Sequence, residues 1–511
     1  MRSAASVDLL AQGLQLGSSV DWHAVAPDVI LTVTACVVLV ADLFLADRSK
    51  WLAMPLSAAG IVVTLVAVVS LAGQRRTTLG GAYEIDSFAL LLKGVFCIIG
   101  LMVLAISFNY FRTGVRFQGE YYFLMLCSLL GGLVMSSARD LITVFIAIEL
   151  ISVPGFVMTG LRKNDAKSNE AALKFFLFGV LSTAVMLYGM SLIYGVTGHT
   201  LLSGIRAALV VGRDLSPAAR SAVGISVPGD PIIVLSVFFI IVGFAFKISA
   251  VPFHFWAPDT YEGAPSPVAA FLSTASKIGG FVGLLVLMFT AFPDVADVWR
   301  PVFAVLATAT MTVGNLIALR QRHIIRLLAY SGIAQSGYIL VTFALIDPAS
   351  PAVNSQALES ALVYISIYAV MDLGAFAAAI AFARRGGTYF IDDYAGLWQR
   401  SPVLATLLAG FMLSLAGAPP MAGAWAKLFV FLAAINAQVY WLAVVMGANA
   451  VIAAFYYLAI VRRMFLEPPE IEGPVEVPFL LRTAMGAAAL ALFVAFIYPP
   501  IITTLAGGSI F

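Results

Sequence analysis

The chain has 511 residues, of which 61% are hydrophobic and only 11% are charged, and its formal net charge is +2. Soluble proteins carry about 25% charged residues, so this composition excludes a soluble enzyme. The near-neutral charge, with no basic stripe, excludes a nucleic-acid-binding protein. Long apolar runs that face lipid account for the composition and indicate a helical protein that crosses a membrane many times.

Spanning the hydrocarbon layer takes about 20 apolar residues, and about 14 segments meet that length. In chain order they cover residues 27–46, 52–72, 87–111, 119–137, 140–160, 169–196, 231–256, 265–291, 300–319, 323–346, 357–383, 401–435, 438–465 and 478–506. We therefore expect an all-α, polytopic membrane fold. A lipid-facing backbone has to satisfy its own hydrogen bonds, and helices do so within one segment.

The basic residues predict how these segments are oriented. Loops after odd-numbered segments hold 16 Lys and Arg, whereas the opposite loops hold eight. Cytoplasmic loops are enriched in basic residues. The first set of loops is therefore predicted to be cytoplasmic, and both chain termini are predicted to lie outside.

A weak internal repeat is visible. A shift of 180 residues carries Asp140 to Arg320, both near segment starts, and Lys247 to Lys427, both inside interrupted segments. Each unit holds five helices, an odd number, so the two copies should be inverted, as in many transporters. The expected divisions are an N-terminal three-helix segment (1–118), two inverted repeats (119–295 and 296–466) and a C-terminal helix (467–511).

Two of the segments are interrupted. One reads AFKISAVPFHFWAP and places Lys247 shortly before Pro252; the other reads SLAGAPPMAGAWAK and ends on Lys427. Proline removes a backbone donor and clashes with the preceding turn, and unwound backbone at membrane depth is tolerated where it lines protein or water. We expect a discontinuous helix in each repeat, with a simple kink as the alternative.

Charged residues inside the segments point to ion transport. Every arginine lies outside the hydrocarbon, whereas five lysines lie within the segments: Lys93, Lys174, Lys247, Lys277 and Lys427. Arginine stays protonated in proteins, but a buried lysine can lose its proton. Charged groups in a membrane are costly and mark ion pathways, so the lysines suggest a proton relay.

Possible partners differ from one lysine to the next. Glu149 is mid-segment and is expected to pair with Lys247, either as a switch or as a static ion pair. Lys174 follows Glu170 by four residues, which favours a local pair. Lys93 is near a segment end and is expected to reach the interface.

Two further titratable residues are candidates beside the lysines. His254 is seven residues beyond Lys247 and either passes protons or is a hydrogen-bonded core histidine. Asp372 is a weaker candidate, and the sequence identifies no partner for it.

Several of these stretches together resemble the antiporter-like membrane subunits of respiratory complex I, and among them most closely the N-type subunit of bacterial NADH-quinone oxidoreductase. The matching stretches are RDLITVFIAIEL, SNEAALKFFLFG, AFKISAVPFHFWAPDTYEGAPSPVAAFLSTASK, QRHIIRLLAYSGIAQSGYIL and SLAGAPPMAGAWAK. They occur in order across the fourth to twelfth segments.

The resemblance implies proton-translocation roles for Glu149, Lys174, Lys247, His254, Lys277 and Lys427. Lys277 would be the central lysine and Lys427 the terminal one, which opens toward the outside. The second repeat departs from the first, because the 180-residue shift carries Glu149 to Ala329. The two halves therefore cannot do identical work.

The resemblance further implies a multi-pass subunit of the bacterial inner membrane that moves protons outward. Quinone reduction in partner subunits would drive it. The sequence has no glycine-rich dinucleotide motif and no metal-ligand cluster. No cofactor is therefore expected in this chain, and NADH, FMN, iron–sulfur clusters and quinone belong to partners.

Other membrane-arm subunits, the peripheral redox arm reached through them, and lipids are the expected partners. The alternatives are a subunit of a multisubunit sodium/proton antiporter, a solitary carrier of a small organic solute, and a membrane scaffold with inert ion pairs.

Overall fold

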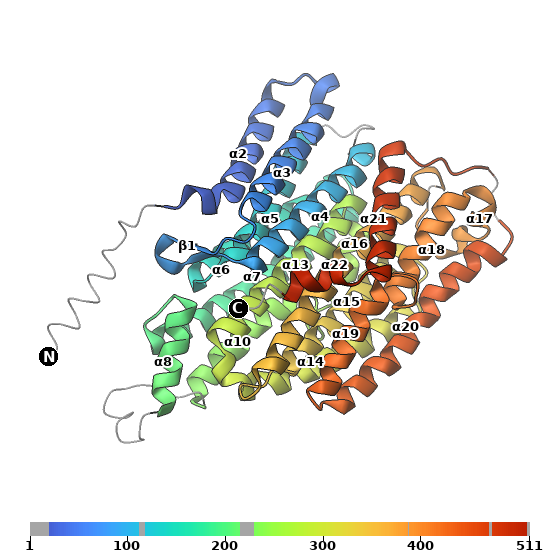
Figure 1. The fold of residues 1–511 in the computed structure, drawn as a ribbon. Coiled ribbons are helices and arrows are strands. Elements are labelled where there is room, and N and C mark those ends of the chain that lie inside the picture. Colours follow the sequence, from blue (N-terminus) through green and yellow to red (C-terminus); the bar gives the residue numbers. More distant parts are fainter. Residues whose placement is uncertain (1–19, 112–117, 215–228, 387, 470–472, 508–511) are drawn as a thin grey trace.

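The structure is a computed structural model that describes residues 20–111, 118–214, 229–386, 388–469 and 473–507. It is almost entirely helical (Figure 1). The first half contains α2 (Trp22–Phe44), α3 (Ala53–Ser70), α4 (Ser87–Phe111), α5 (Gln118–Ser137), α6 (Leu141–Thr159), α7 (Ala166–Thr197), α8 (Leu202–Asp214), α10 (Pro231–Lys247), α11 (Trp256–Gly263), α12 (Ser266–Phe271) and α13 (Lys277–Val286).

The second half continues with α14 (Ala296–Ala318), α15 (Ile324–Ala344), α16 (Pro351–Gly386), α17 (Leu397–Arg400), α18 (Pro402–Ala416), α19 (Gly423–Asn436), α20 (Tyr440–Leu466), α21 (Phe479–Ile497) and α22 (Pro500–Gly507). Short 3₁₀ turns cover Asp47–Leu52, Leu79–Gly81, Pro293–Val295 and Ile391–Tyr394.

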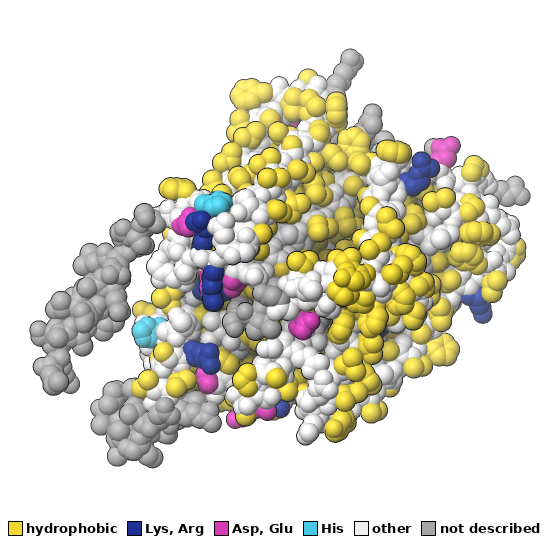
Figure 2. Space-filling view, viewed as in Figure 1, with side chains coloured by type: hydrophobic (Ala, Val, Ile, Leu, Met, Phe, Trp, Pro, Cys, Tyr) yellow, Lys and Arg dark blue, Asp and Glu magenta, His cyan; other side chains and the backbone are white. Residues whose placement is uncertain are grey.

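The predicted all-α, multi-pass class is confirmed. Within the described residues, 12 helices are long and apolar enough to cross a membrane. The two remaining predicted segments, 231–256 and 401–435, are the interrupted ones, and each is split into shorter helices. Hydrophobic side chains cover much of the visible surface, as contact with lipid requires (Figure 2).

Both expected helix interruptions are present. Helix α10 ends at Lys247, and α11 begins only at Trp256. In the second case α18 ends at Ala416, followed by Gly417 in the left-handed region with φ 82°, and α19 begins at Gly423. A glycine takes this conformation without the steric penalty of a Cβ, so the chain can turn sharply there.

The predicted segment 265–291 is not a uniform helix. Two π-helical turns, Leu272–Ser276 and Leu287–Ala291, flank α13, and the first of them ends directly before Lys277. Such turns often occur at functional sites because they shift the side chains that follow around the helix. Periodicity in the sequence gave no sign of either turn.

Two elements between the predicted segments were missed. Strands β1 (Arg76–Thr78) and β2 (Tyr83–Ile85) form a short antiparallel hairpin between α3 and α4, with Arg76 opposite Ile85. The other is α8, which buries Leu202, Ile205 and Leu209 while Val211 stays exposed. Both elements are too short or too polar to satisfy a membrane-span criterion.

The centre of the bundle is formed by the segment from α12 to the second π turn, together with α15 and α16. In the most apolar stretch of the segment from α12 to the second π turn, every residue is buried. In the corresponding stretches of α15 and α16, 89% of the residues are buried, compared with 28–33% in α2, α3 and α21. Side chains on the central helices therefore lie farthest from lipid.

Two sequence predictions about organisation remain predictions. The unit boundaries near residues 118, 295 and 466 are one of them. The second is that both chain termini lie outside, and it stays a prediction because residues 1–19 and 508–511 are not among the described residues.

Candidate functional site

Three lysines of the helix bundle, two of them buried, lie at irregular points of their helices. Lys247 is the last residue of α10 at the first helix break, and its exposure is 3%. Lys277 follows the first π turn and is completely buried. Lys427 is one turn into α19, just beyond the second break. Each ammonium group therefore lies next to backbone that departs from a regular α-helix.

The expected close ion pair between Glu149 and Lys247 is absent. Among the described residues, ion pairs with N···O distances up to 4.0 Å do not include Glu149, and its buried Oε1 has no hydrogen-bond partner. Lys247 Nζ instead donates to Ser152 Oγ at 2.8 Å. Glu149 is still the charged group that acts on Lys247 electrostatically. The sequence placed both in the same repeat but could not specify their separation.

His254 lies between α10 and α11, in the first helix break. Its Nδ1 is buried and has no hydrogen-bond partner within the described part of the chain. It makes no direct hydrogen bond to Lys247 or Lys277 there. The predicted position near the break is correct, whereas the proton-passing role stays a prediction.

Lys277 lies beside Asp372, a partner that the sequence did not identify. Both side chains are completely buried, and the two charges act on each other. Ser273 Oγ, one helical turn before Lys277, donates to Asp372 Oδ2 at 2.6 Å. Tyr368 on α16 donates its hydroxyl hydrogen to the Ser273 carbonyl at 3.0 Å. Asp372 of α16 is thereby held near Lys277.

Lys427 is held by the end of the preceding helix. Its Nζ donates to the carbonyls of Leu415 at 3.0 Å and Ala416 at 2.7 Å, and it lies 4.8 Å from the centroid of the Tyr338 ring. The last carbonyls of a helix carry partial negative charge, so α18 stabilises the ammonium form of Lys427 without a carboxylate.

A buried polar chain, missed by sequence reasoning, leads to Lys427. Gln335 Nε2 donates to the Leu415 carbonyl at 2.9 Å and to the Tyr457 hydroxyl at 3.3 Å. The Tyr457 hydroxyl also bonds Ser331 Oγ. These residues come from α15 and α20, and a glutamine or tyrosine in an apolar helix gives no signal of its own. They end at the Leu415 carbonyl, which Lys427 also contacts.

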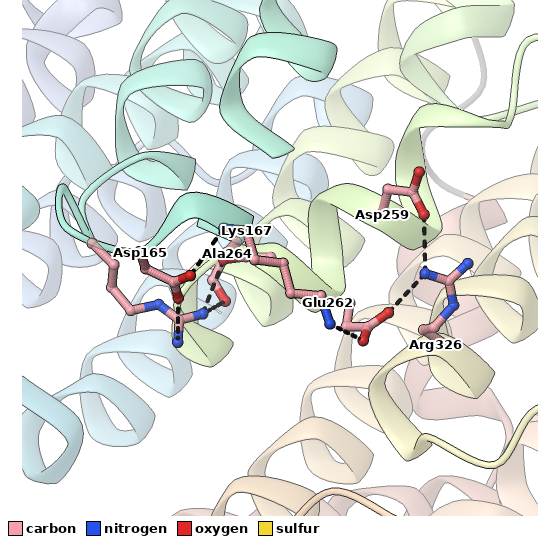
Figure 3. A network of polar contacts seen from close by, with 8 residues as sticks. Asp165, Lys167, Asp259, Glu262, Ala264 and Arg326 are labelled. Carbon is pink, nitrogen blue, oxygen red and sulfur yellow. Dashed lines mark hydrogen bonds and ion pairs between the residues drawn. The ribbon is translucent and has the colours of Figure 1, made fainter. Parts of the chain in front are cut away.

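Lys174 belongs to a separate charge network at one end of the bundle. It pairs with Glu170 at 2.7 Å, which confirms the local pair, and also with Asp259 of α11 at 3.1 Å. Arg326 of α15 binds Asp259 at 2.9 Å and Glu262 at 2.7 Å, as Figure 3 shows. The network joins α7, α11 and α15. Asp259 and Glu262 were missed because they are distant in sequence from Lys174.

The two carboxylates that α11 contributes to this network are held ionised by their partners. Burial alone would raise the pKa of Asp259, but hydrogen bonds from Lys174 and Arg326 outweigh it and lower the pKa below the ordinary value of 3.8. The pKa of Glu262 is lowered in the same way, by Lys167 and Arg326 against the effect of burial.

The expectation for Lys93 is wrong. Its side chain does not reach the interface but is completely buried, with Nζ 2.9 Å from Asp28 Oδ1 and 2.8 Å from the Leu133 carbonyl. Tyr83 of β2 completes the cluster at 3.0 Å. Asp28 is distant in sequence and sits near the start of α2, so no local spacing predicts the pair.

In the residues that the structure describes, no group of three or more His, Cys, Asp or Glu could hold a metal ion. Cys36, Cys97 and Cys127 are all free. Lysine and histidine side chains can bind and release protons.

Comparisons with known proteins agree with this arrangement. Residues 138–453 match the family described as NADH:quinone oxidoreductase/Mrp antiporter, TM. The chain is 41% identical over 487 residues to NADH-quinone oxidoreductase subunit N 2 of Streptomyces griseus, covering 92% of this chain and 88% of that protein.

Two solved structures have the same fold. A chain of respiratory complex I from Thermus thermophilus with bound aureothin superposes with a TM-score of 0.76 at 27% identity, covering 94% of this chain and 99% of that one. A chain of the Mrp complex from Dietzia gives 0.78 at 19% identity over 96% and 97%, a likeness of fold alone. The family match spans the helices that carry Lys247, Lys277 and Lys427. The chain therefore belongs to the NADH:quinone oxidoreductase and Mrp antiporter family of transmembrane subunits.

Proposed function

We propose that this chain is a proton-translocating membrane-arm subunit of a bacterial NADH:quinone oxidoreductase. The observation that carries the proposal is the placement of Lys247, Lys277 and Lys427 next to helix breaks or a π turn inside the bundle. Lysines can lose a proton, whereas arginines cannot. The relatives named NADH-quinone oxidoreductase subunit N support the assignment to that complex.

In this proposal protons enter from the cytoplasm near Lys247, pass to Lys277 and leave toward the outside by Lys427. His254 and water bridge the gaps between them. The negative charge of Glu149 favours the protonated form of Lys247, so a movement that separates the two releases a proton. Lys174 joins the network that links α7 to α11 and α15, through which a neighbouring subunit could act on the first helix break.

The driving energy comes from other chains of the complex. NADH oxidation, FMN, the iron–sulfur clusters and quinone reduction belong to partner subunits. This chain receives the energy as an electrostatic or conformational change at its interface with them. As a subunit of the complex it is then part of a translocase without redox chemistry of its own.

The test uses the complete complex reconstituted into liposomes. Lys247→Ala and Glu149→Ala should each reduce the protons pumped per NADH oxidised, because the first removes a proton-carrying amine and the second removes the charge that favours its protonation. Glu359→Gln, a carboxylate on α16 outside the relay, is the control and should pump normally. Full pumping by both relay variants would refute the assigned roles.

A second candidate is a subunit of a multisubunit sodium/proton antiporter, which the shared fold with the Mrp complex chain favours. Such an assembly would contain no redox partners. Purification of the native complex separates the two, since copurification with peripheral iron–sulfur subunits supports the oxidoreductase. Their absence, together with sodium-dependent proton exchange, supports the antiporter.

A further inference from the structure

An ammonium and a carboxylate share one buried region without a direct bond between them. Lys277 Nζ and Asp372 Oδ1 are both buried polar atoms that have no hydrogen-bond partner among the described residues. Both side chains are completely enclosed. Buried charges are normally paired or hydrogen-bonded, so a buried amine without a hydrogen-bond partner near a buried carboxylate indicates a group that changes its protonation.

The surrounding groups fix the carboxylate but leave the amine mobile. Asp372 Oδ2 accepts the 2.6 Å bond from Ser273. Among the described residues, the Lys277 amine lies 5.7 Å from the centroid of the Tyr261 ring and faces Gly332 on α15, which has no side chain. A Cβ on Gly332 would lie 2.8 Å from Lys277 Nζ. The amine can therefore move while its counter-charge stays in place.

The position of α16 makes this pair a link between the two halves. Helix α16 packs against α12, the first π turn and α13 on one side and against α18 and α19, which carries Lys427, on the other. The position that corresponds to Glu149 by the 180-residue shift is Ala329, so the second half has no carboxylate there. Asp372 supplies the negative charge from a different helix.

We propose that Asp372 is the counter-charge that determines whether Lys277 carries a proton, the part that Glu149 plays for Lys247. The inference rests on the proposed proton translocation and names the group that controls its central step. A carboxylate within 4–6 Å favours the charged form of a neighbouring amine by about 10- to 1,000-fold. While Asp372 is ionised, Lys277 holds its proton. When the amine moves away from Asp372, Lys277 releases its proton toward Lys427.

The test is Asp372→Asn in the complete complex reconstituted into liposomes, with pumping measured against NADH oxidation. The amide keeps an oxygen that can accept from Ser273 but removes the charge. Because protonation of Lys277 becomes harder, pumping should fall about tenfold or more at the usual assay pH. It should recover as the pH is lowered by about two units. The other titratable groups around Asp372 are Tyr261, Tyr368 and Tyr457.

Two further variants separate charge from structure. Asp372→Glu restores the charge and should restore pumping, whereas Glu359→Gln removes a carboxylate from the outer part of the same helix and should leave pumping unchanged. Normal pumping by Asp372→Asn at every pH would overturn the inference. A loss that neither acid nor Asp372→Glu relieves would also overturn it, since that result indicates a packing role. Loss of pumping in Lys247→Ala, measured in parallel, shows that the proposed function stands even if this inference fails.

Discussion

Gly332→Ala displaces the central lysine without removing any charge. Gly332 lies on α15, where a Cβ would sit 2.8 Å from Lys277 Nζ and 3.0 Å from the Tyr368 hydroxyl. Both atoms are at the ends of their side chains. The added methyl group therefore moves the amine and the hydroxyl rather than the backbone.

The size of the displacement follows from these distances. Ordinary contacts begin at 3.4 Å, so the amine has to shift by about 0.6 Å. Overpacking of this kind lowers the stability of the fold by about 1–3 kcal/mol, whereas replacing glycine by alanine inside a helix raises it by about 1 kcal/mol. Stability should therefore fall by at most about 2 kcal/mol. A misplacement approaching 1 Å at a reacting group costs up to about 100-fold in rate, and we expect pumping to fall about tenfold.

The assay is NADH-driven proton uptake by liposomes, scaled to the amount of assembled complex. Gly410→Ala is the matched control, because its Cβ would lie 2.8 Å from the uncharged tip of Met421. That variant should assemble and pump normally. Pumping by Gly332→Ala equal to that of Gly410→Ala, with both assembled to the same level, would refute the placement of Lys277 in the proton path.

Three further predictions concern the groups around this path. Lys93→Met leaves the Asp28 carboxylate buried and without its ion-pair partner and should destabilise the subunit by about 3–5 kcal/mol. Stability should recover in part in the double variant that also carries Asp28→Asn. Equal melting temperatures of the wild type and Lys93→Met in detergent would contradict this prediction. Gln335→Leu removes one donor to the Leu415 carbonyl and should cost about 1–3 kcal/mol and slow pumping, so a variant with normal rates would show that the polar chain is not on the path. The partners of Asp259 lower its pKa below 3.8, so the stability that Asp259 contributes is present above that pH and is lost as the pH falls through the lowered pKa. Asp259→Asn should therefore flatten the loss of thermal stability below about pH 4. An acid-denaturation profile identical to that of the wild type would contradict this prediction.

The fold was largely predictable because a membrane imposes a simple length rule. Each apolar run of about 20 residues becomes a helix, and proline and glycine near Lys247 and Lys427 marked the two breaks. The π turn before Lys277 was not predictable, since one additional residue in a helical turn leaves composition and periodicity almost unchanged.

The candidate site was predicted one residue at a time, and of its pairings only the local one between Glu170 and Lys174 was predicted correctly. A lysine inside an apolar run is conspicuous because its burial is costly, and this identified Lys247, Lys277 and Lys427. Partners from distant helices give no such signal: Asp28 for Lys93, and Asp372 for Lys277. Tertiary packing determines these contacts, and local spacing contains no information about it.

The central claim is that buried lysines in this chain carry protons by losing and regaining them. Lys277→Arg tests it most directly, because arginine keeps the positive charge but cannot be deprotonated in proteins. Lys93→Arg places the same substitution at an equally buried lysine outside the path. In liposomes that contain the assembled complex, we expect Lys277→Arg to oxidise NADH with strongly reduced pumping, whereas Lys93→Arg should pump normally. Wild-type pumping by Lys277→Arg would show that Lys277 does not need to lose its proton.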